Sequence, residues 1–330
     1  MIRSFIKYLI IFSIPLLILF GAYIYGDPFK VIHKYDLYLS EYVMLNRGYI
    51  STSVFLKNDP QYNFDSFIFG SSRSTAFTCK EWVKYLSPGC SAFSYGNWNE
   101  SIEGILGKVQ FIDLKGNKIE NAIIVIDTDQ TFRKNSRSLS RDHYLISGMD
   151  PGRFHMLYFS QSLRNVWLIP ASIDYKLFRT RRSYMKGFVG MNPGDIDPVR
   201  NDYLPDEEDN ILRDSVAYYS GSHDRFYTRP ETDTISGIQI TPDDLAMIQK
   251  INLIFKKHRT NFKIIIGPLY DQIKFNNCDL DVLKEIFGEE NVFDFSGINY
   301  ITGNMYNYKN DVTHFRNRTG SMILRLIYKN

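Results

Sequence analysis

Two short apolar runs rich in β-branched residues constrain the fold of this chain most strongly. They are residues 122–126 (AIIVI) and 263–266 (KIII). Runs of this length, with no regular alternation of polar residues, suit strands that are buried on both faces, as in a parallel sheet covered by helices. Polar or turn-forming residues follow each run. The sequence therefore favours an α/β fold.

Weaker patterns on either side of these runs complete an alternation of strands and helices. Three more strands are predicted at residues 65–69, 91–95 and 291–295. Helices are predicted at residues 101–111, 241–258, 279–287 and 321–328. The start at Thr241 is the clearest, because a capping Thr is followed by Pro242 and two acids. The alternation predicts a three-layer sandwich with a five-stranded parallel sheet, whose ligands lie at the carboxyl ends of the strands.

The N-terminal segment differs from the rest of the chain. Residues 8–26 form an uncharged run of 19 residues, which as a helix would span about 28 Å, close to the hydrocarbon thickness of a bilayer. We expect residues 1–26 to be an uncleaved anchor whose transmembrane helix contacts the lipid bilayer. A cleaved signal peptide and a buried core helix are the alternatives. Basic residues flank the run on both sides, so they do not fix its orientation.

Residues 133–240 do not follow the alternation. They contain an acidic stretch at 206–209 and enough apolar residues at 154–178 for one or two helices. They also contain a basic cluster of Arg179, Arg181, Arg182 and Lys186. We interpret this region as an insertion in an α/β domain of residues 27–330, where it could cover a site like a lid. A solvated excursion without a role is the alternative.

Composition excludes several classes of protein. The 330 residues include 39 Lys and Arg against 36 Asp and Glu, so the chain lacks the basic excess that is typical of nucleic-acid binding. Three cysteines are too few for a disulfide-rich scaffold. Cys79 and Cys90 could pair in an oxidising compartment, and Cys278 is expected to be a lone buried thiol. Asp127 and Asp129 lack a nearby histidine, so helix capping is preferred to a metal site, and no cofactor is expected.

Two short motifs, far apart in the sequence, carry the chemistry. The first is FIFGSSR at residues 67–73, which places Ser72 after a predicted buried strand and at the start of a helix. Amides at a helix start can stabilise a developing anion, and Gly70 lets the backbone turn sharply. Gly-Ser-Ser sequences also occur as simple turns and caps, so this motif alone does not identify a nucleophile.

The second motif is Asp311-Val312-Thr313-His314, which follows the fifth predicted strand. An Asp three residues before a His can accept the Nδ1 proton of the imidazole, which leaves Nε2 free to act as a base toward a serine hydroxyl. Among the six histidines, His314 alone has a carboxylate at this spacing. The loop that carries it should return to the same edge of the sheet as Ser72.

The order of these motifs resembles the SGNH (GDSL-like) hydrolase superfamily, particularly its membrane-anchored members associated with acylation of cell-surface polysaccharide. Residues 70–73 (GSSR) resemble the first block of the family, with Ser72 as nucleophile. Asp311-x-x-His314 resembles the last block. Residues 95–97 (YGN) are similar to the block that donates an oxyanion-hole glycine.

The resemblance implies an SGNH/flavodoxin-like fold and two sets of site residues. The catalytic residues would be Ser72, His314 and Asp311, and the oxyanion donors would be the amides of Ser72 and Gly96 with the side chain of Asn97. The likeness covers about residues 60–125 and 260–328. One departure is that the third block of the family usually has an Asn, in a Gly-x-Asn pattern, where this chain has DTDQ at 127–130.

Two neighbours of these motifs are candidate substrate-binding residues. Arg73 could bind a carboxylated substrate, or it could form a structural ion pair. Trp98 lies beside the predicted oxyanion turn and could touch a carbohydrate, or it could belong to the core.

The resemblance implies a serine acyltransferase or esterase, anchored in the membrane, that acts on O-acyl groups of cell-surface carbohydrate. Most of the chain would lie on the periplasmic or extracellular side of a bacterial inner membrane, as a single-pass protein. A multi-spanning membrane acyltransferase could supply the acyl groups. The alternatives are a catalytically degenerate SGNH-like binding or assembly module at the membrane surface, and an unrelated tethered α/β protein in which both motifs are coincidental.

Overall fold

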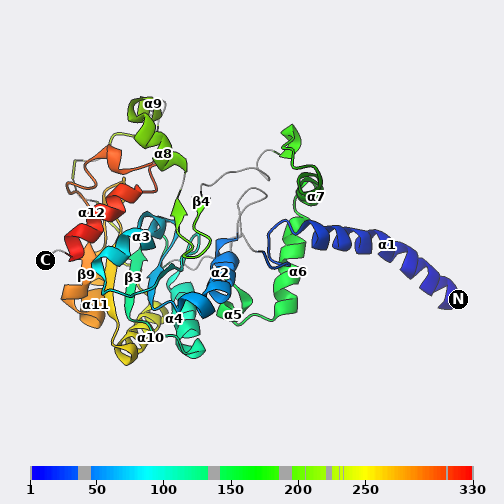
Figure 1. Ribbon diagram of the computed structural model, residues 1–330, viewed down its shortest axis with the longest axis horizontal. Helices are drawn as coiled ribbons and strands as arrows, with labels where there is room; N and C mark the ends of the chain where they lie inside the picture. The colour runs from blue at the N-terminus through cyan, green and yellow to red at the C-terminus, as the bar shows by residue number, and fades with distance from the viewer. Residues whose placement is uncertain are drawn as a thin grey trace. The chain divides into compact units, whose positions relative to one another are not determined.

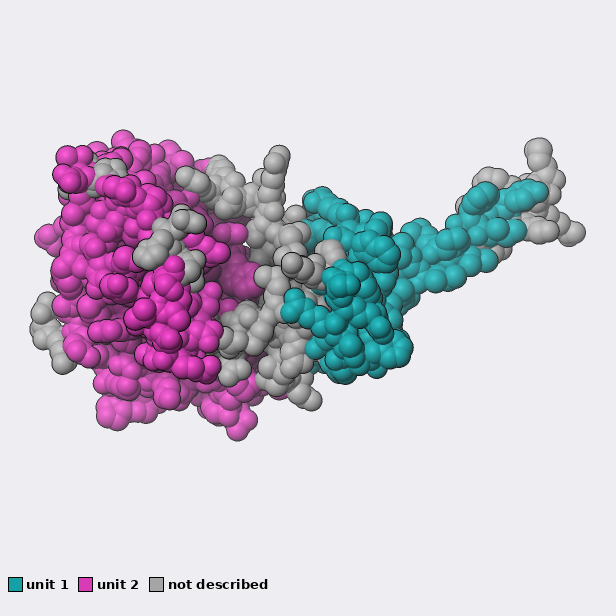
Figure 2. All heavy atoms as spheres, turned by 90° about the horizontal axis from the view of Figure 1, so that it is seen from above, with its two compact units in different colours: residues 1–46, 148–193 teal, residues 47–147, 194–330 magenta. Residues whose placement is uncertain are grey.

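The chain divides into two units, coloured separately in Figure 2. The first contains residues 1–46 and 148–193, and the second contains residues 47–147 and 194–330. A computed structural model describes residues 2–35, 46–132, 142–185, 195–204, 206–220, 225–229, 231–232, 234–309 and 311–328. Residues 133–240, predicted to be one insertion, are thus shared between the units, and residues 148–193 belong with the N-terminal segment.

The second unit is built on a five-stranded parallel sheet (Figure 1). Its strands are β1 (Ser66–Phe69), β2 (Ala92–Ser94), β3 (Asn121–Ile126), β7 (Asn261–Ile266) and β9 (Val292–Asp294). All five predicted strands are therefore confirmed. Every neighbouring pair in the order β2-β1-β3-β7-β9 is parallel. This is the 2-1-3-4-5 order of flavodoxin-like sheets, in which the strand order reverses between β1 and β3.

Helices cover both faces of this sheet (Figure 1). On one face, side chains of β1, β3 and β7 share a buried apolar cluster with α3 (Cys79–Trp82) and α12 (Asn317–Tyr328). Trp82 belongs to this core, and its indole N–H donates a hydrogen bond to the Tyr328 hydroxyl at 2.9 Å. A buried indole needs such a partner to offset the loss of water.

The opposite face is covered by α2 (Arg47–Tyr62), α4 (Ile102–Lys115) and α10 (Pro242–His258). Phe55 of α2 packs against Phe67 of β1 at 6.0 Å and Phe93 of β2 at 5.5 Å, measured between ring centroids. Apolar layers on both faces explain why the strands show no polar alternation.

The predicted helix ends follow the expected chemistry. The Thr241 side chain accepts from the Asp244 amide while the Asp244 carboxylate accepts from the Thr241 amide, which is a complete capping box. The helix α4 continues past the predicted residue 111 to Lys115, where Gly116 ends it at φ 88°. The helix α12 begins at Asn317, four residues before the predicted 321.

The remaining elements connect or flank the sheet. Helices are α5 (Tyr144–Ser147), α8 (Asp206–Arg213), α9 (Ser215–Ser220) and α11 (Asn277–Phe287), with short 3₁₀ turns at Ser72–Ala76, Val83–Tyr85, Ser183–Met185, Glu289–Asn291 and Met305–Asn307. Two-residue strands are β4 (Asp195–Ile196), β5 (Tyr203–Leu204), β6 (Thr234–Ile235) and β8 (Ile273–Lys274).

The first unit is helical. It contains α1 (Ile2–Gly26), α6 (Pro151–Ser162) and α7 (Leu168–Phe178), so the apolar stretch at 154–178 does form two helices. The rings of Phe20 and Tyr23 in α1 lie 5.1 and 5.2 Å from the ring of Phe159 in α6. This aromatic packing gives a physical reason why residues 148–193 join the N-terminal segment instead of the sheet.

The helix α1 covers the run that was predicted to be a transmembrane anchor. In the part of the chain that the structure describes, no helix has both the length and the apolar character needed to cross a membrane. The predicted transmembrane helix is therefore unsupported.

The three cysteines are free thiols in the structure. Cys79 is buried, Cys90 is half-buried and Cys278 is exposed. The prediction that Cys278 is buried is wrong, because it lies in the first turn of α11 and does not face the core.

The packing of α12 depends on Gly320. A Cβ atom at this position would lie 2.2 Å from the backbone oxygen of Ala76, so the helix or the turn would have to move. We expect Gly320→Ala to lower the free energy of unfolding by about 1–3 kcal/mol, the usual cost of overpacking. Urea denaturation measures this change. Gly237→Ala is the control, since nothing lies within 4 Å of its added methyl. Equal stability of the two variants would contradict the close approach of α12.

Candidate active site

Ser72 lies at the carboxyl end of β1, beside the point where the strand order reverses. The chain turns at Gly70, whose φ of 146° favours glycine, and an added Cβ would lie 3.0 Å from the Val125 oxygen. The Ser71 side chain then accepts from the Arg73 amide at 3.1 Å and caps the 3₁₀ turn Ser72–Ala76. Local chemistry thus places Ser72 as the first residue of a turn at the ligand edge of the sheet.

The loop that carries His314 is fixed just before α12. Tyr308 and Phe315 form an antiparallel bridge, and the Lys309 amide donates to the His314 oxygen at 2.9 Å. Phe315 is buried, and its ring lies 5.9 Å from that of Phe77, which follows the Ser72 turn. Phe315 therefore anchors the His314 loop in the core beside Ser72.

The structure brings Ser72, His314 and Asp311 together although Ser72 and His314 are 242 residues apart. The distance from Ser72 Oγ to His314 Nε2 is 2.7 Å, and the distance from His314 Nδ1 to Asp311 Oδ2 is 2.6 Å. Because the carboxylate accepts the Nδ1 proton, Nε2 can accept the proton of the serine hydroxyl. This arrangement can activate Ser72 as a nucleophile.

The Asp311 carboxylate is held in its charged form. Burial alone would raise its pKa, but the hydrogen bonds from the His314 ring and from the amides of His314 and Thr313, together with the charge of the imidazole, outweigh burial and lower the pKa to about 2. The amides of Thr313 and His314 also donate to Asp311 Oδ1, at 3.1 and 3.0 Å. The sequence did not single out Thr313, whose hydroxyl lies 3.0 Å from His314 Nδ1. Asp311 is therefore ionised across the neutral range and keeps the imidazole oriented.

Arg73 joins three segments at this edge of the sheet. Its Nε donates to the Thr313 oxygen at 2.9 Å, and its Nη2 donates to Asp129 at 3.0 Å. Its Nη1 bonds to the other Asp129 oxygen and lies 3.5 Å from Asp127 Oδ1. The side chain is only 5% exposed. These contacts show that Arg73 forms the structural ion pair, and its binding of a substrate carboxylate stays a prediction.

Asp127 and Asp129 follow β3, and the described residues after them, up to 132, form turns and no helix, which differs from the preference for helix capping. Asp127 is fully buried, and burial raises its pKa although the Arg73 guanidinium opposes the shift. The acidic residues after β3 therefore serve as counter-ions of Arg73. Only the contact across the sheet reveals this role, since Arg73 and Asp129 are 56 residues apart.

Gly96 lies against the turn that carries Ser72. The Asn97 amide donates to the Gly70 oxygen at 3.1 Å, and a Cβ on Gly96 would lie 3.0 Å from that oxygen and 2.8 Å from Ser74 Oγ. No hydrogen bond from the amide of Ser72 or Gly96 is found among the described residues. The role of both amides as oxyanion donors stays a prediction.

The Asn97 side chain has hydrogen-bond partners within the protein. Its Nδ2 donates to Asp142 at 3.4 Å, and its Oδ1 accepts from the Trp98 amide at 2.7 Å. Asp142 lies 3.4 Å from the buried Lys108 ammonium, which also pairs with Glu100. The Asn97 side chain is therefore engaged in a network that braces the loop. Trp98 is half-buried at the next position.

One group of potential metal ligands occurs in the described ranges. Asp65, Cys90 and Glu120 place their ligand atoms within 4.8 Å of one another. Asp65 and Glu120 precede β1 and β3, so this group lies at the amino-terminal edge of the sheet, opposite Ser72. The residues around Ser72 offer a nucleophile, a base and a carboxylate that orients the base.

No family model matches the chain, and no curated protein matches it either. The geometry around Ser72 is therefore the basis for the function proposed below.

The depressed pKa of Asp311 makes the stability of the second unit depend on pH. Its pKa is about 2 in the folded chain and about 4 when unfolded, so the stabilisation is present above pH 4 and is lost as the pH falls through 2. We expect Asp311→Asn to be less stable than the parent at pH 6, with the difference shrinking toward pH 2. Urea denaturation at several pH values measures it. A constant difference would contradict the ionised state of Asp311.

Proposed function

We propose that this chain is a serine acyltransferase or esterase, attached to a membrane, that acts on O-acyl groups of cell-surface carbohydrate. The observation that carries the proposal is the 2.7 Å contact between Ser72 Oγ and His314 Nε2, with Asp311 2.6 Å behind the imidazole. The resemblance of residues 70–73 and of Asp311-x-x-His314 to SGNH hydrolases supports the same reaction class.

The reaction would proceed in two steps. In the first, the Ser72 hydroxyl attacks the ester carbonyl, His314 accepts its proton, and Asp311 stabilises the imidazolium. The bond to the leaving alcohol breaks, and that alcohol takes the proton from His314. In the second step, water or a sugar hydroxyl attacks the acyl-serine and gives its proton to His314; the bond from the acyl carbon to Ser72 Oγ breaks, and His314 returns the proton to that oxygen. Water gives hydrolysis, and a sugar hydroxyl gives transfer.

The oxyanion of each intermediate would be bound by the amides of Ser72 and Gly96. The position that carries an Asn donor in SGNH hydrolases is part of the DTDQ segment here, and Asp129 in that segment binds Arg73. Loss of one such donor commonly costs on the order of 10²–10³ in rate. We therefore expect slow turnover of a simple ester. The absence of this Asn from the DTDQ segment also favours the second candidate function, a degenerate binding or assembly module.

Membrane attachment is the part of the proposal that sets the substrate class. Among the described side chains of α1, Phe12, Leu17 and Ile18 are 78%, 64% and 67% exposed, which supports burial of this helix in lipid. We place most of the chain on the periplasmic or extracellular side, where cell-surface carbohydrate is acylated. A multi-spanning membrane acyltransferase is the proposed source of acyl groups.

Substitution of Ser72 tests the proposed reaction. The parent should hydrolyse p-nitrophenyl acetate and should be labelled at Ser72 by a fluorophosphonate, as located by peptide mass spectrometry. Ser72→Ala should lose both, and His314→Gln should lose most of both, because the nucleophile or its base is missing. Ser53→Ala is a matched control, since this hydroxyl bonds within α2.

Two results would contradict an acyl-enzyme. One is turnover that survives in Ser72→Ala, and the other is a parent with neither turnover nor label while circular dichroism shows a folded chain. The second result would favour the degenerate module.

Arg73 should act through the position of His314. We expect Arg73→Gln to lower kcat for p-nitrophenyl acetate by about 10-fold or more with little change in KM, because the neutral ester gives the guanidinium nothing to bind. Asp129→Asn should have a smaller effect in the same direction, since the Thr313 contact remains. A defect confined to KM, and only for a carboxylated ester, would show instead that Arg73 binds substrate.

A further inference from the structure

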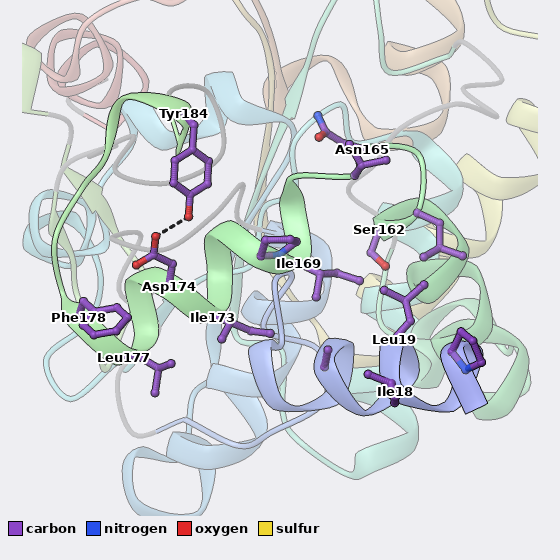
Figure 3. A pocket seen from close by; sticks show the side chains of 15 residues that line it. Ile18, Leu19, Ser162, Asn165, Ile169, Ile173, Asp174, Leu177, Phe178 and Tyr184 are labelled. Atoms are coloured by element: carbon purple, nitrogen blue, oxygen red, sulfur yellow. Dashed lines mark hydrogen bonds between the residues drawn. The ribbon is translucent and has the colours of Figure 1, made fainter. Parts of the chain in front are cut away.

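A large apolar groove lies within the first unit, between α1 and α7 (Figure 3). Its volume is about 1070 Å³, and it runs beside Ile18 and Leu19 of α1 and Ile169, Ile173 and Leu177 of α7. The end of α7 is tied to the end of α1, because Lys176 Nζ donates to the Tyr25 oxygen at 2.6 Å. The groove is therefore a feature of two helices that are joined at one end.

The rim of the groove leaves large apolar side chains in solvent. Val166 and Phe178, which line it, are 76% and 62% exposed, and the neighbouring Trp167 is 56% exposed. The Trp167 ring lies 5.7 Å from that of Tyr184, another lining residue. A contiguous apolar surface of this kind marks a place where another apolar body binds.

A cluster of cations lies directly after the groove-lining end of α7. Arg179, Arg181 and Arg182 are all exposed. Arg182 also pairs with Asp174, at 2.8 Å from its Nε. Lys186, the fourth member of the basic cluster in the sequence, lies outside the described residues. An apolar groove with an aromatic rim and arginines at one end matches the two parts of an anionic lipid, the acyl chain and the phosphate.

We propose that the groove between α1 and α7 binds an anionic phospholipid of the bilayer, with an acyl chain along Ile18, Ile169 and Ile173 and its phosphate at Arg179, Arg181 and Arg182. In this state α7 lies in the plane of the membrane surface with Trp167 and Phe178 at the level of the headgroups. Charge complementarity selects this occupant, because the positive charge of the three exposed guanidinium groups attracts a phosphate, which an apolar protein helix does not carry. The inference rests on the proposed membrane attachment and is independent of the chemistry at Ser72.

Fluorescence quenching by brominated lipids tests the proposal on the full chain. The protein is reconstituted in nanodiscs of phosphatidylcholine and phosphatidylglycerol in which one of the two lipids carries bromine on its acyl chains. We expect the emission to be quenched, and more strongly when phosphatidylglycerol is the brominated lipid. Trp167→Phe should lose the quenching, whereas Trp98→Phe should keep it, because neither Trp98 nor its chain neighbours line the groove.

Substitution of the cations separates the headgroup from the acyl chain. Arg179→Gln, Arg181→Gln and Arg182→Gln together should remove the preference for brominated phosphatidylglycerol while the quenching itself remains. High salt should weaken the preference in the parent, since exposed charges are screened.

Two outcomes would overturn the lipid site. Equal quenching by the two brominated lipids in the parent would exclude selection of an anionic headgroup. Absence of quenching at Trp167 would show that the groove does not face lipid and is filled by something else, such as a helix of a partner protein. Ester turnover measured on the same samples reports on the proposed function separately, so failure of one proposal can be told from failure of the other.

Discussion

The Arg73 guanidinium is the contact on which the geometry around Ser72 depends. It bonds to the Thr313 carbonyl beside His314 and to Asp129 after β3, and it belongs to the turn that carries Ser72 itself. Burying a cation in this place is costly unless its counter-ions are equally fixed, and Asp127 and Asp129 supply them. The Arg73 side chain therefore links the turn that carries Ser72, the loop that carries His314 and the segment after β3. Its buried contacts fix the relative positions of these three segments more firmly than exposed contacts would.

The central layers of the fold could be predicted from the sequence because their signals are local. Continuous β-branched runs identify buried strands, and a Thr-Pro-Asp-Asp start identifies the helix at Pro242–His258. The division of the chain into two units could not be predicted, because it depends on which apolar surface residues 148–193 pack against. They pack against α1 through Phe159, a partner more than 130 positions away. The hydrophobicity of a segment shows that it must pack against another apolar surface, but it does not show which surface that is.

The candidate site also has one part that could be predicted from the sequence and one part that could not. A serine, a histidine and an aspartate three residues before that histidine are the types that form a Ser-His-Asp triad. Ser72, His314 and Asp311 could therefore be selected before the fold was known. The sequence around Arg73, by contrast, would look the same whether this residue binds a substrate or forms an ion pair within the protein. Its role depends on Asp129 and on the Thr313 carbonyl, which are near only in three dimensions.

Each of the two units is formed from two separate segments of the chain, and this has a consequence for the order in which the ribosome completes them. Ser72 and its strand precede the second half of the helical unit, at 148–193, and the loop of His314 comes only after the last strand of the sheet. A ribosome therefore delivers the hydroxyl first, residues 148–193 of the helical unit next, and the imidazole after the last strand of the sheet. Until the chain reaches His314, a nascent chain holds Ser72 without this imidazole, so the contact between the two side chains forms only after the strands of the sheet and the helical unit have been synthesised.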